Sequence, residues 1–83
     1  GLVNEVVPPE KLDEAVNAKV ASLLSSAPNA LAEAKKLIRL VPGMNAEKAR
    51  EYTLAKIAEL RAAPEGQEGM RAFLEKRKAN WVK

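Results

Sequence analysis

The chain contains no cysteine and no histidine among its 83 residues. Without cysteine it can form neither a disulfide bond nor a thiolate site. Without histidine it lacks the usual base of a hydrolytic triad and a principal ligand of zinc and haem. Carboxylates are plentiful, but they lie on polar faces of the expected helices, where no pair stands out for acid–base catalysis. We therefore expect no metal site, no cofactor and no catalytic residue within these residues.

Aromatic residues and net charge are both scarce. The only aromatic side chains are Tyr52, Phe73 and Trp81, and the net charge is +3. Proteins that bind nucleic acids usually carry a stronger positive charge and stack aromatic rings on bases. The C-terminal stretch EGMRAFLEKRKANWVK holds five basic residues, but glutamates are interspersed among them. A nucleic-acid binder would show a steep dependence on salt, yet the mixed charge argues against this hypothesis, and we expect no nucleic-acid partner.

Long apolar runs are absent as well. No run approaches the roughly 20 residues that a transmembrane helix needs. The apolar residues near the N-terminus form too short a run for a signal peptide. We therefore expect no membrane partner.

The N-terminal stretch GLVNEVVPP is rich in β-branched residues and stops at a double proline. It predicts a short strand over Leu2 to Val7, or an extended segment. No second strand candidate follows, and a lone strand needs partners, so the pairing strands are expected outside these residues. The chain also begins with glycine rather than methionine, which is typical of a fragment. We divide the chain into an extended segment, residues 1–8, that joins a core outside the chain, and a helical domain, residues 9–83.

Prolines and glycines divide the remainder into four segments with helical periodicity. We expect a helix from Pro9 to about Ser25, a second from Pro28 to Val41, a third from its N-cap Asn45 to Ala63, and a fourth over at least Gln67–Lys78. The fold class is therefore all-α, with a short N-terminal extended segment followed by about four helices. A chain this short buries only about 60–65% of its unfolded surface, so its core will be thin.

The fourth expected helix carries the candidate packing residues. One apolar stripe contains Met70, Phe73, Leu74, Arg77 and Trp81. Gly66 and Gly69 are unusual there, because glycine inside a helix costs about 1 kcal/mol relative to alanine. Glycine at such a position indicates the close approach of another group. We expect Gly69 and Met70 to make packing or subunit contacts, and Trp81 to anchor the end of the helix or to lie at an interface.

Two stretches are similar to the C-terminal portion of one family, the enoyl-CoA hydratases and isomerases (crotonases). These are GLVNEVVPPEKLDEAV at the start and EGQEGMRAFLEKRKANW at the end, with APNALAEAKK resembling a family helix between them. The terminal pattern EG-x-x-AF-x-EKRK is matched by Glu68, Gly69, Ala72, Phe73, Glu75, Lys76, Arg77 and Lys78. The letters KRKAN most resemble the hydratase branch.

The resemblance implies a C-terminal helical and trimerisation domain whose catalytic core lies outside these residues. In that family the core holds an oxyanion hole and two glutamates that add water across the double bond of a 2-enoyl-CoA thioester. The C-terminal region covers the active site, builds a trimer or a dimer of trimers, and contacts acyl-CoA. The parent protein would then be an enzyme of fatty-acid or branched-chain acyl-CoA breakdown, although this chain alone would be inactive. Such an enzyme is expected in the cytoplasm, or in the mitochondrial matrix of a eukaryote.

By motif position the resemblance implies that Phe73 and Lys76 contact CoA. Phe73 would lie against the adenine or the pantetheine, and Lys76 would face the phosphates, for which lysine is a suitable point charge. Because they are three residues apart, we expect both on one face of the last helix. The alternatives are that Phe73 packs in the core and that Lys76 is an ordinary surface lysine.

Two wider alternatives remain open at this point. The chain could be a stand-alone helical protein-interaction module without enzymatic activity, or its parent could be an isomerase rather than a hydratase. The acyl chain that the parent accepts is not specified by these residues.

Overall fold

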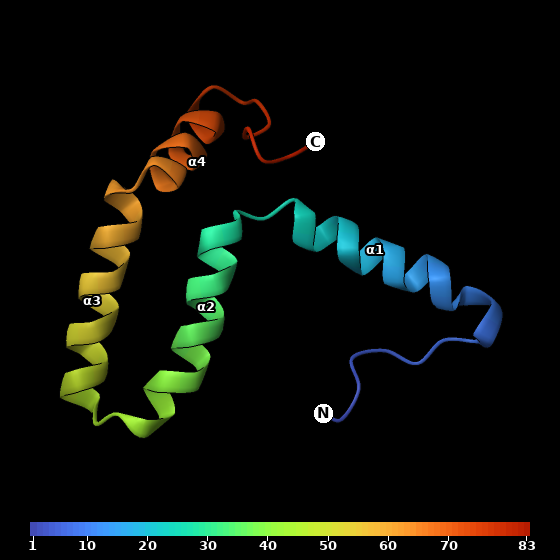
Figure 1. Cartoon of the computed structure of the whole chain (residues 1–83), viewed down its shortest axis with the longest axis horizontal. Coiled ribbons are helices and arrows are strands. Elements are labelled where there is room, and N and C mark those ends of the chain that lie inside the picture. The colour runs from blue at the N-terminus through green and yellow to red at the C-terminus, as the bar shows by residue number, and fades with distance from the viewer.

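A computed structural model describes all of residues 1–83. It contains four α-helices, two short 3-10 helices and no strand (Figure 1), which confirms the predicted all-α fold class. The elements, in chain order, are η1 (Pro9–Lys11), α1 (Leu12–Leu24), α2 (Pro28–Leu40), η2 (Val41–Gly43), α3 (Ala46–Ala62) and α4 (Pro64–Leu74). Proline stands in the first turn of η1, α2, η2 and α4, where its missing N–H costs no hydrogen bond.

The N-terminal segment does not form the strand that its sequence predicts for residues 2–7. It contains no strand, and residues 1–7 make no backbone hydrogen bond. The segment instead runs back beside α1 (Figure 1), where Glu5 forms an ion pair of 3.5 Å with Lys19. The physical reason is the absence of a second strand, because a strand gains its stability from the ladder that it forms with a neighbour.

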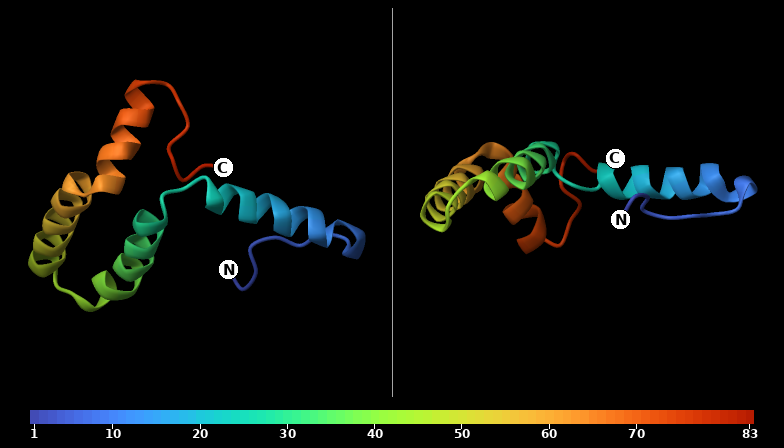
Figure 2. Two further views of the ribbon diagram at one scale, coloured as in Figure 1. Left: turned by 45° about the horizontal axis from the view of Figure 1, so that its top comes forward. Right: turned by 90° about the horizontal axis from the view of Figure 1, so that it is seen from below.

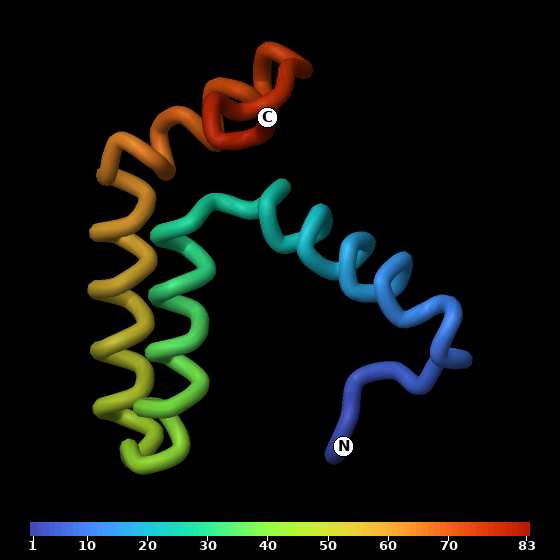
Figure 3. The backbone as a smooth tube through the Cα atoms, turned by 45° about the vertical axis from the view of Figure 1, so that its right-hand side comes forward, coloured from blue at the N-terminus to red at the C-terminus, as the bar shows by residue number.

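Helices α2 and α3 lie side by side and antiparallel, and η2 connects them at one end (Figures 1 and 3). The side chain of Asn45 accepts a hydrogen bond of 2.9 Å from the N–H of Lys48, which confirms the predicted N-cap of α3. Across the pair, the carboxylate of Glu33 lies 3.6 Å from the ammonium of Lys56. These local and interhelical contacts fix the hairpin on which the C-terminal part rests.

The molecule is a thin, open layer of helices (Figure 2). Its extents are 47 × 37 × 15 Å, and the smallest is little more than the diameter of one helix. Its accessible surface is 7183 Å², whereas a compact protein of 9.0 kDa would expose about 4900 Å². Ala72 is the only fully buried residue. The apolar stripes of the helices are therefore left exposed, and the expected thin core is nearly absent.

Helix α4 differs from the sequence prediction at both ends. It begins at Pro64, three residues before Gln67, and it ends at Leu74 rather than at Lys78. Lys76 has a φ of 52°, and the N–H groups of Lys76 and Arg77 donate back into the last turn of the helix, to Phe73 and Ala72. This is a Schellman motif, a helix end that normally has glycine at the left-handed position. The chain reverses there, so Arg77 and Trp81 do not continue the predicted helical stripe.

We predict that Gly66→Ala destabilises the corner between α3 and α4. A Cβ atom on Gly66 would collide with the backbone carbonyl of Leu60, and a backbone atom cannot move aside as a flexible side chain can. We expect a loss of about 1–3 kcal/mol in the free energy of unfolding, measured by urea denaturation of the protein that carries this chain. Gly43→Ala is the matched control, because nothing lies within 4 Å of its Cβ position. Equal stability of the two variants would contradict the prediction.

Candidate functional site

The two residues predicted to contact CoA lie at the C-terminal end of α4, but not on one helix face. Phe73 is in the last turn of α4, whereas Lys76 lies beyond the helix end in a left-handed conformation. The expectation of a shared helix face is therefore wrong, because the helix stops four residues earlier than predicted. Phe73 is also 82% exposed, so the alternative of core packing within this chain is wrong too. Both side chains face solvent.

A carboxylate–guanidinium pair folds the residues after α4 back onto the helix. Arg77 donates two parallel hydrogen bonds to the carboxylate of Glu68, with N–O distances of 2.7 and 3.0 Å, and a third of 2.6 Å to Glu75. The N–H of Asn80 also donates to Glu68, at 2.9 Å. Bidentate pairs of this kind combine charge with a fixed geometry. Glu68 and Arg77 both belong to the terminal pattern, but their residue types and spacing alone do not predict that they pair.

The hydrogen bonds from Arg77 hold the pKa of Glu68 well below its usual value of 4.5, at about 2. Partial burial of the carboxylate opposes this shift, and the N–H of Asn80 adds to it. In the other direction, Glu68 and then Glu75 raise the pKa of Arg77. The pair therefore stays ionised over the ordinary pH range.

After this pair, the chain turns back and places Trp81 next to the C-terminal end of α1. Its indole Nε1–H donates to the carbonyl oxygen of Ser25, 3.2 Å away, at the C-terminal end of α1. A Cβ atom on Gly69 would lie 3.3 Å from the indole ring. The absent side chain of Gly69 thus leaves room for an aromatic ring, which is the group that approaches closely there.

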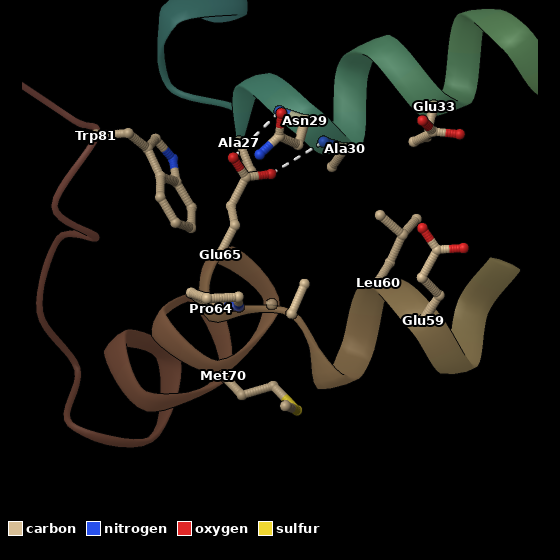
Figure 4. Close-up of a pocket in the computed structure, with 13 residues that line it drawn as sticks. Ala27, Asn29, Ala30, Glu33, Glu59, Leu60, Pro64, Glu65, Met70 and Trp81 are labelled. Atoms are coloured by element: carbon tan, nitrogen blue, oxygen red, sulfur yellow. Dashed lines mark hydrogen bonds between the residues drawn. The ribbon is translucent and has the colours of Figure 1, made fainter.

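A concavity of about 610 Å³ lies where α2 begins, α3 ends and α4 begins (Figure 4). Glu65 from α4 points across it and accepts hydrogen bonds from the N–H groups of Asn29 and Ala30, at 3.1 and 3.0 Å. The first N–H groups of a helix have no partner within it, and Ala27 at the N-cap position has no side chain to supply one. The remaining lining residues include Glu33, Glu59, Leu60, Ala63, Pro64, Gly66, Gly69, Met70 and Trp81.

The carboxylates of this concavity are already engaged. Glu33 pairs with Lys36 at 2.6 Å, and Glu59 pairs with Lys56 at 2.8 Å. The hydrogen bond from Lys36 lowers the pKa of Glu33, while the hydrogen bond to Glu59 raises the pKa of Lys56. Together with the cap formed by Glu65, these contacts leave no free carboxylate pair to act as acid and base. The concavity lies where three helices meet, and Glu33 and Glu65 link these helices to one another.

Two further properties concern possible sites of other kinds. No group of three or more metal-binding side chains is arranged to hold an ion. None of the helices is both long enough and apolar enough to cross a lipid bilayer.

The chain is similar to known proteins along its whole length. The sequence pattern of the family described as "Enoyl-CoA hydratase/isomerase" matches residues 1–83. A protein of Thermus thermophilus with the name "Putative enoyl-CoA hydratase" is 36% identical over 77 residues, which cover 93% of this chain and 30% of that protein. The chain therefore spans less than a third of the length of this curated relative. No solved structure matches it significantly.

We predict that Glu68 makes the protein sensitive to acid. Its pKa is lowered in the folded state, so its contribution to stability is present above pH 4.5 and is lost as the pH falls towards about 2. Glu68→Gln should lower the urea midpoint at neutral pH, and the difference from the wild type should shrink towards zero across that window. Glu47→Gln is the control, because Glu47 has no ion-pair partner. A difference that does not depend on pH would contradict the assignment.

Proposed function

The chain belongs to the enoyl-CoA hydratase/isomerase family, and from this membership we propose that it is the C-terminal helical segment of an enoyl-CoA hydratase. That enzyme adds water across the double bond of a 2-enoyl-CoA thioester during fatty-acid or branched-chain acyl-CoA breakdown. The catalytic residues lie outside this chain. The segment itself covers the active site, contacts acyl-CoA and mediates assembly into a trimer or a dimer of trimers.

The match of the family pattern to every residue of the chain carries this proposal. The shape of the segment supports it, because a layer that exposes about 2300 Å² more than a compact protein of its mass needs a surface to cover. That excess is comparable with the area buried in large, permanent interfaces. A catalytic core and neighbouring subunits would provide such surfaces.

Exposure of the apolar pair at the end of α4 supports the contact with CoA. Phe73 and Leu74 are 82% and 78% exposed, although they lie in the only helix that contains a buried residue. An aromatic ring presented in this way can stack on a purine such as the adenine of CoA.

The backbone at Lys76 supports a role for its side chain. A lysine in the left-handed region costs about 1–2 kcal/mol, which glycine would avoid. Unfavourable conformations of this kind are concentrated at functional sites. Lys76 also forms no ion pair, because Arg77 takes both nearby carboxylates, those of Glu68 and Glu75. Its ammonium is therefore free to meet a phosphate group.

The proposal is tested by measuring the hydration of 2-enoyl-CoA thioesters by the complete protein that carries this chain. We expect conversion to 3-hydroxyacyl-CoA, and we expect Phe73→Ala to raise KM about 5–150-fold with little change in kcat, as for the loss of one base-stacking contact. Leu74→Ala is the matched control, because Leu74 is equally exposed and adjacent in sequence. A folded protein without hydratase activity would refute the proposal, and an equal fall of kcat and kcat/KM would refute a pure binding role.

We further predict that Lys76→Gly changes stability and binding in opposite directions. Glycine removes the strain at φ 52°, so the free energy of unfolding should rise by about 0.5–1 kcal/mol. The loss of the ammonium should raise KM for acyl-CoA about 10–150-fold, the effect of one hydrogen bond to a charged group.

Lys78→Ala serves as the control, since it removes the same charge two residues later. An unchanged KM in Lys76→Gly, or an equal rise of KM in both variants, would contradict a specific contact with CoA.

A further inference from the structure

The backbone is strained at Lys76, where the chain reverses after α4 (Figure 2). Its φ of 52° is the only positive φ in the chain, and a residue with a Cβ atom occupies this left-handed region only at a cost in free energy. Strained conformations persist where the surrounding contacts enforce them. The contacts that flank Lys76 therefore indicate what holds it there.

Two backbone hydrogen bonds close the reversal. The N–H of Lys76 donates to the carbonyl of Phe73 at 3.2 Å, and the N–H of Arg77 donates to the carbonyl of Ala72 at 3.0 Å. Ala72 is the one fully buried residue, so the second bond is anchored at the best-packed point of α4. Helix ends of this type make the same bonds with glycine at the left-handed position. The backbone bonds alone therefore do not explain why a lysine is tolerated.

The carboxylate of Glu68 adds contacts to the chain beyond Lys76. It accepts the two parallel hydrogen bonds of Arg77, at 2.7 and 3.0 Å, and a third from the N–H of Asn80 at 2.9 Å. Glu68 precedes Lys76 in the chain, whereas Arg77 and Asn80 follow it. The side chains of Glu68 and Arg77 are 15% and 38% exposed, so solvent screens this pair less than a fully exposed one. One carboxylate thus ties α4 to the segment after it, with the strained lysine between them.

We propose that Glu68 and Arg77 are positioning residues for the contact with acyl-CoA: their pair holds Lys76 in the left-handed conformation and so sets where its ammonium meets a phosphate group. This inference rests on the proposed function, in which Lys76 makes that contact. When the pair opens, residue 76 returns to an ordinary backbone region, and its side chain points in another direction. The pair itself touches no substrate.

Arg77→Lys is the first test variant, because lysine keeps the positive charge but lacks the planar fork that binds a carboxylate through two hydrogen bonds. Glu68→Gln breaks the pair from the other side and keeps the test valid if Arg77→Lys loses helical content by circular dichroism. Arg71→Lys is the matched control, because Arg71 is exposed and lies in the last turn of α4, outside the pair.

The first measurement is hydrogen exchange of the backbone amides in the complete protein, without CoA. The N–H groups of Arg77 and Asn80 are hydrogen-bonded across the reversal, so their exchange reports its opening. We expect their protection to fall about 10-fold or more in Arg77→Lys and in Glu68→Gln, as for the loss of one hydrogen bond to a charged group. Protection should be unchanged in Arg71→Lys. Full protection in both test variants would overturn the proposal.

The second measurement is KM and kcat for a 2-enoyl-CoA. We expect each test variant to raise KM about 10-fold with little change in kcat, because apparent affinity falls with the population of the competent conformation. In a Lys76→Ala background, which lacks the ammonium, the same substitutions should leave KM unchanged. A merely structural role would raise KM equally with and without the lysine, and that result would contradict positioning through Lys76.

Glu68→Gln also separates positioning from simple electrostatics. It removes a negative charge from the neighbourhood of Lys76, so charge alone would strengthen the binding of a phosphate group and lower KM. Positioning requires KM to rise, and a lower or unchanged KM would refute it. Absence of hydratase activity in the wild-type protein would instead refute the proposed function. The exchange measurement involves no CoA, so it still decides whether the pair holds the reversal at Lys76.

Discussion

A single layer of helices cannot bury its own apolar stripes, and this constraint governs the whole chain. Helices α1 to α4 lie in a layer 15 Å thick, and only Ala72 is fully buried. Stability within the layer therefore comes from polar contacts at helix ends and between helices, such as the Glu33–Lys56 ion pair. Several other ion pairs, such as Lys11–Glu14, are exposed to solvent, and exposed pairs are individually weak. The layer needs an opposing surface, and the similar protein of Thermus thermophilus, of which this chain covers 30%, is long enough to contain one.

The C-terminal pattern combines residues that pair or pack within the chain with residues whose side chains have no partner in it. Glu68 and Arg77 pair with each other, and Gly69 makes room for Trp81. These three residues of the pattern stabilise the reversal of the chain after α4. Phe73 and Lys76, in contrast, point to solvent without partners, and Lys76 occupies an unfavourable backbone conformation. Lys78 of the same pattern is also exposed and unpaired, so the left-handed backbone at Lys76 is what distinguishes these two lysines.

Much of the helical organisation could be predicted from the sequence, because its signals are local. Pro28 marks the start of α2, and Asn45 caps α3 through a residue only three positions away. The end of α4 could not be predicted in this way. The apolar stripe continued to Trp81, but the bidentate pairing of Arg77 with Glu68 reverses the chain at Lys76 instead. Hydrophobic periodicity does not predict such a reversal, because a left-handed helix end is normally recognised by a glycine, and here the residue is a lysine.

The sequence by itself determined where most of the helices lie, the Asn45 cap of α3, the family and the absence of thiol or imidazole chemistry, since each depends on residue type or on neighbours within a few positions. Only the tertiary structure decided which groups meet across long separations. The carboxylate of Glu65 reaches α2 across 35 residues, and the indole of Trp81 reaches α1 across 56. Both contacts satisfy backbone groups at helix ends, and every helix end carries such groups. The sequence pattern therefore does not predict which helix end each of these side chains contacts.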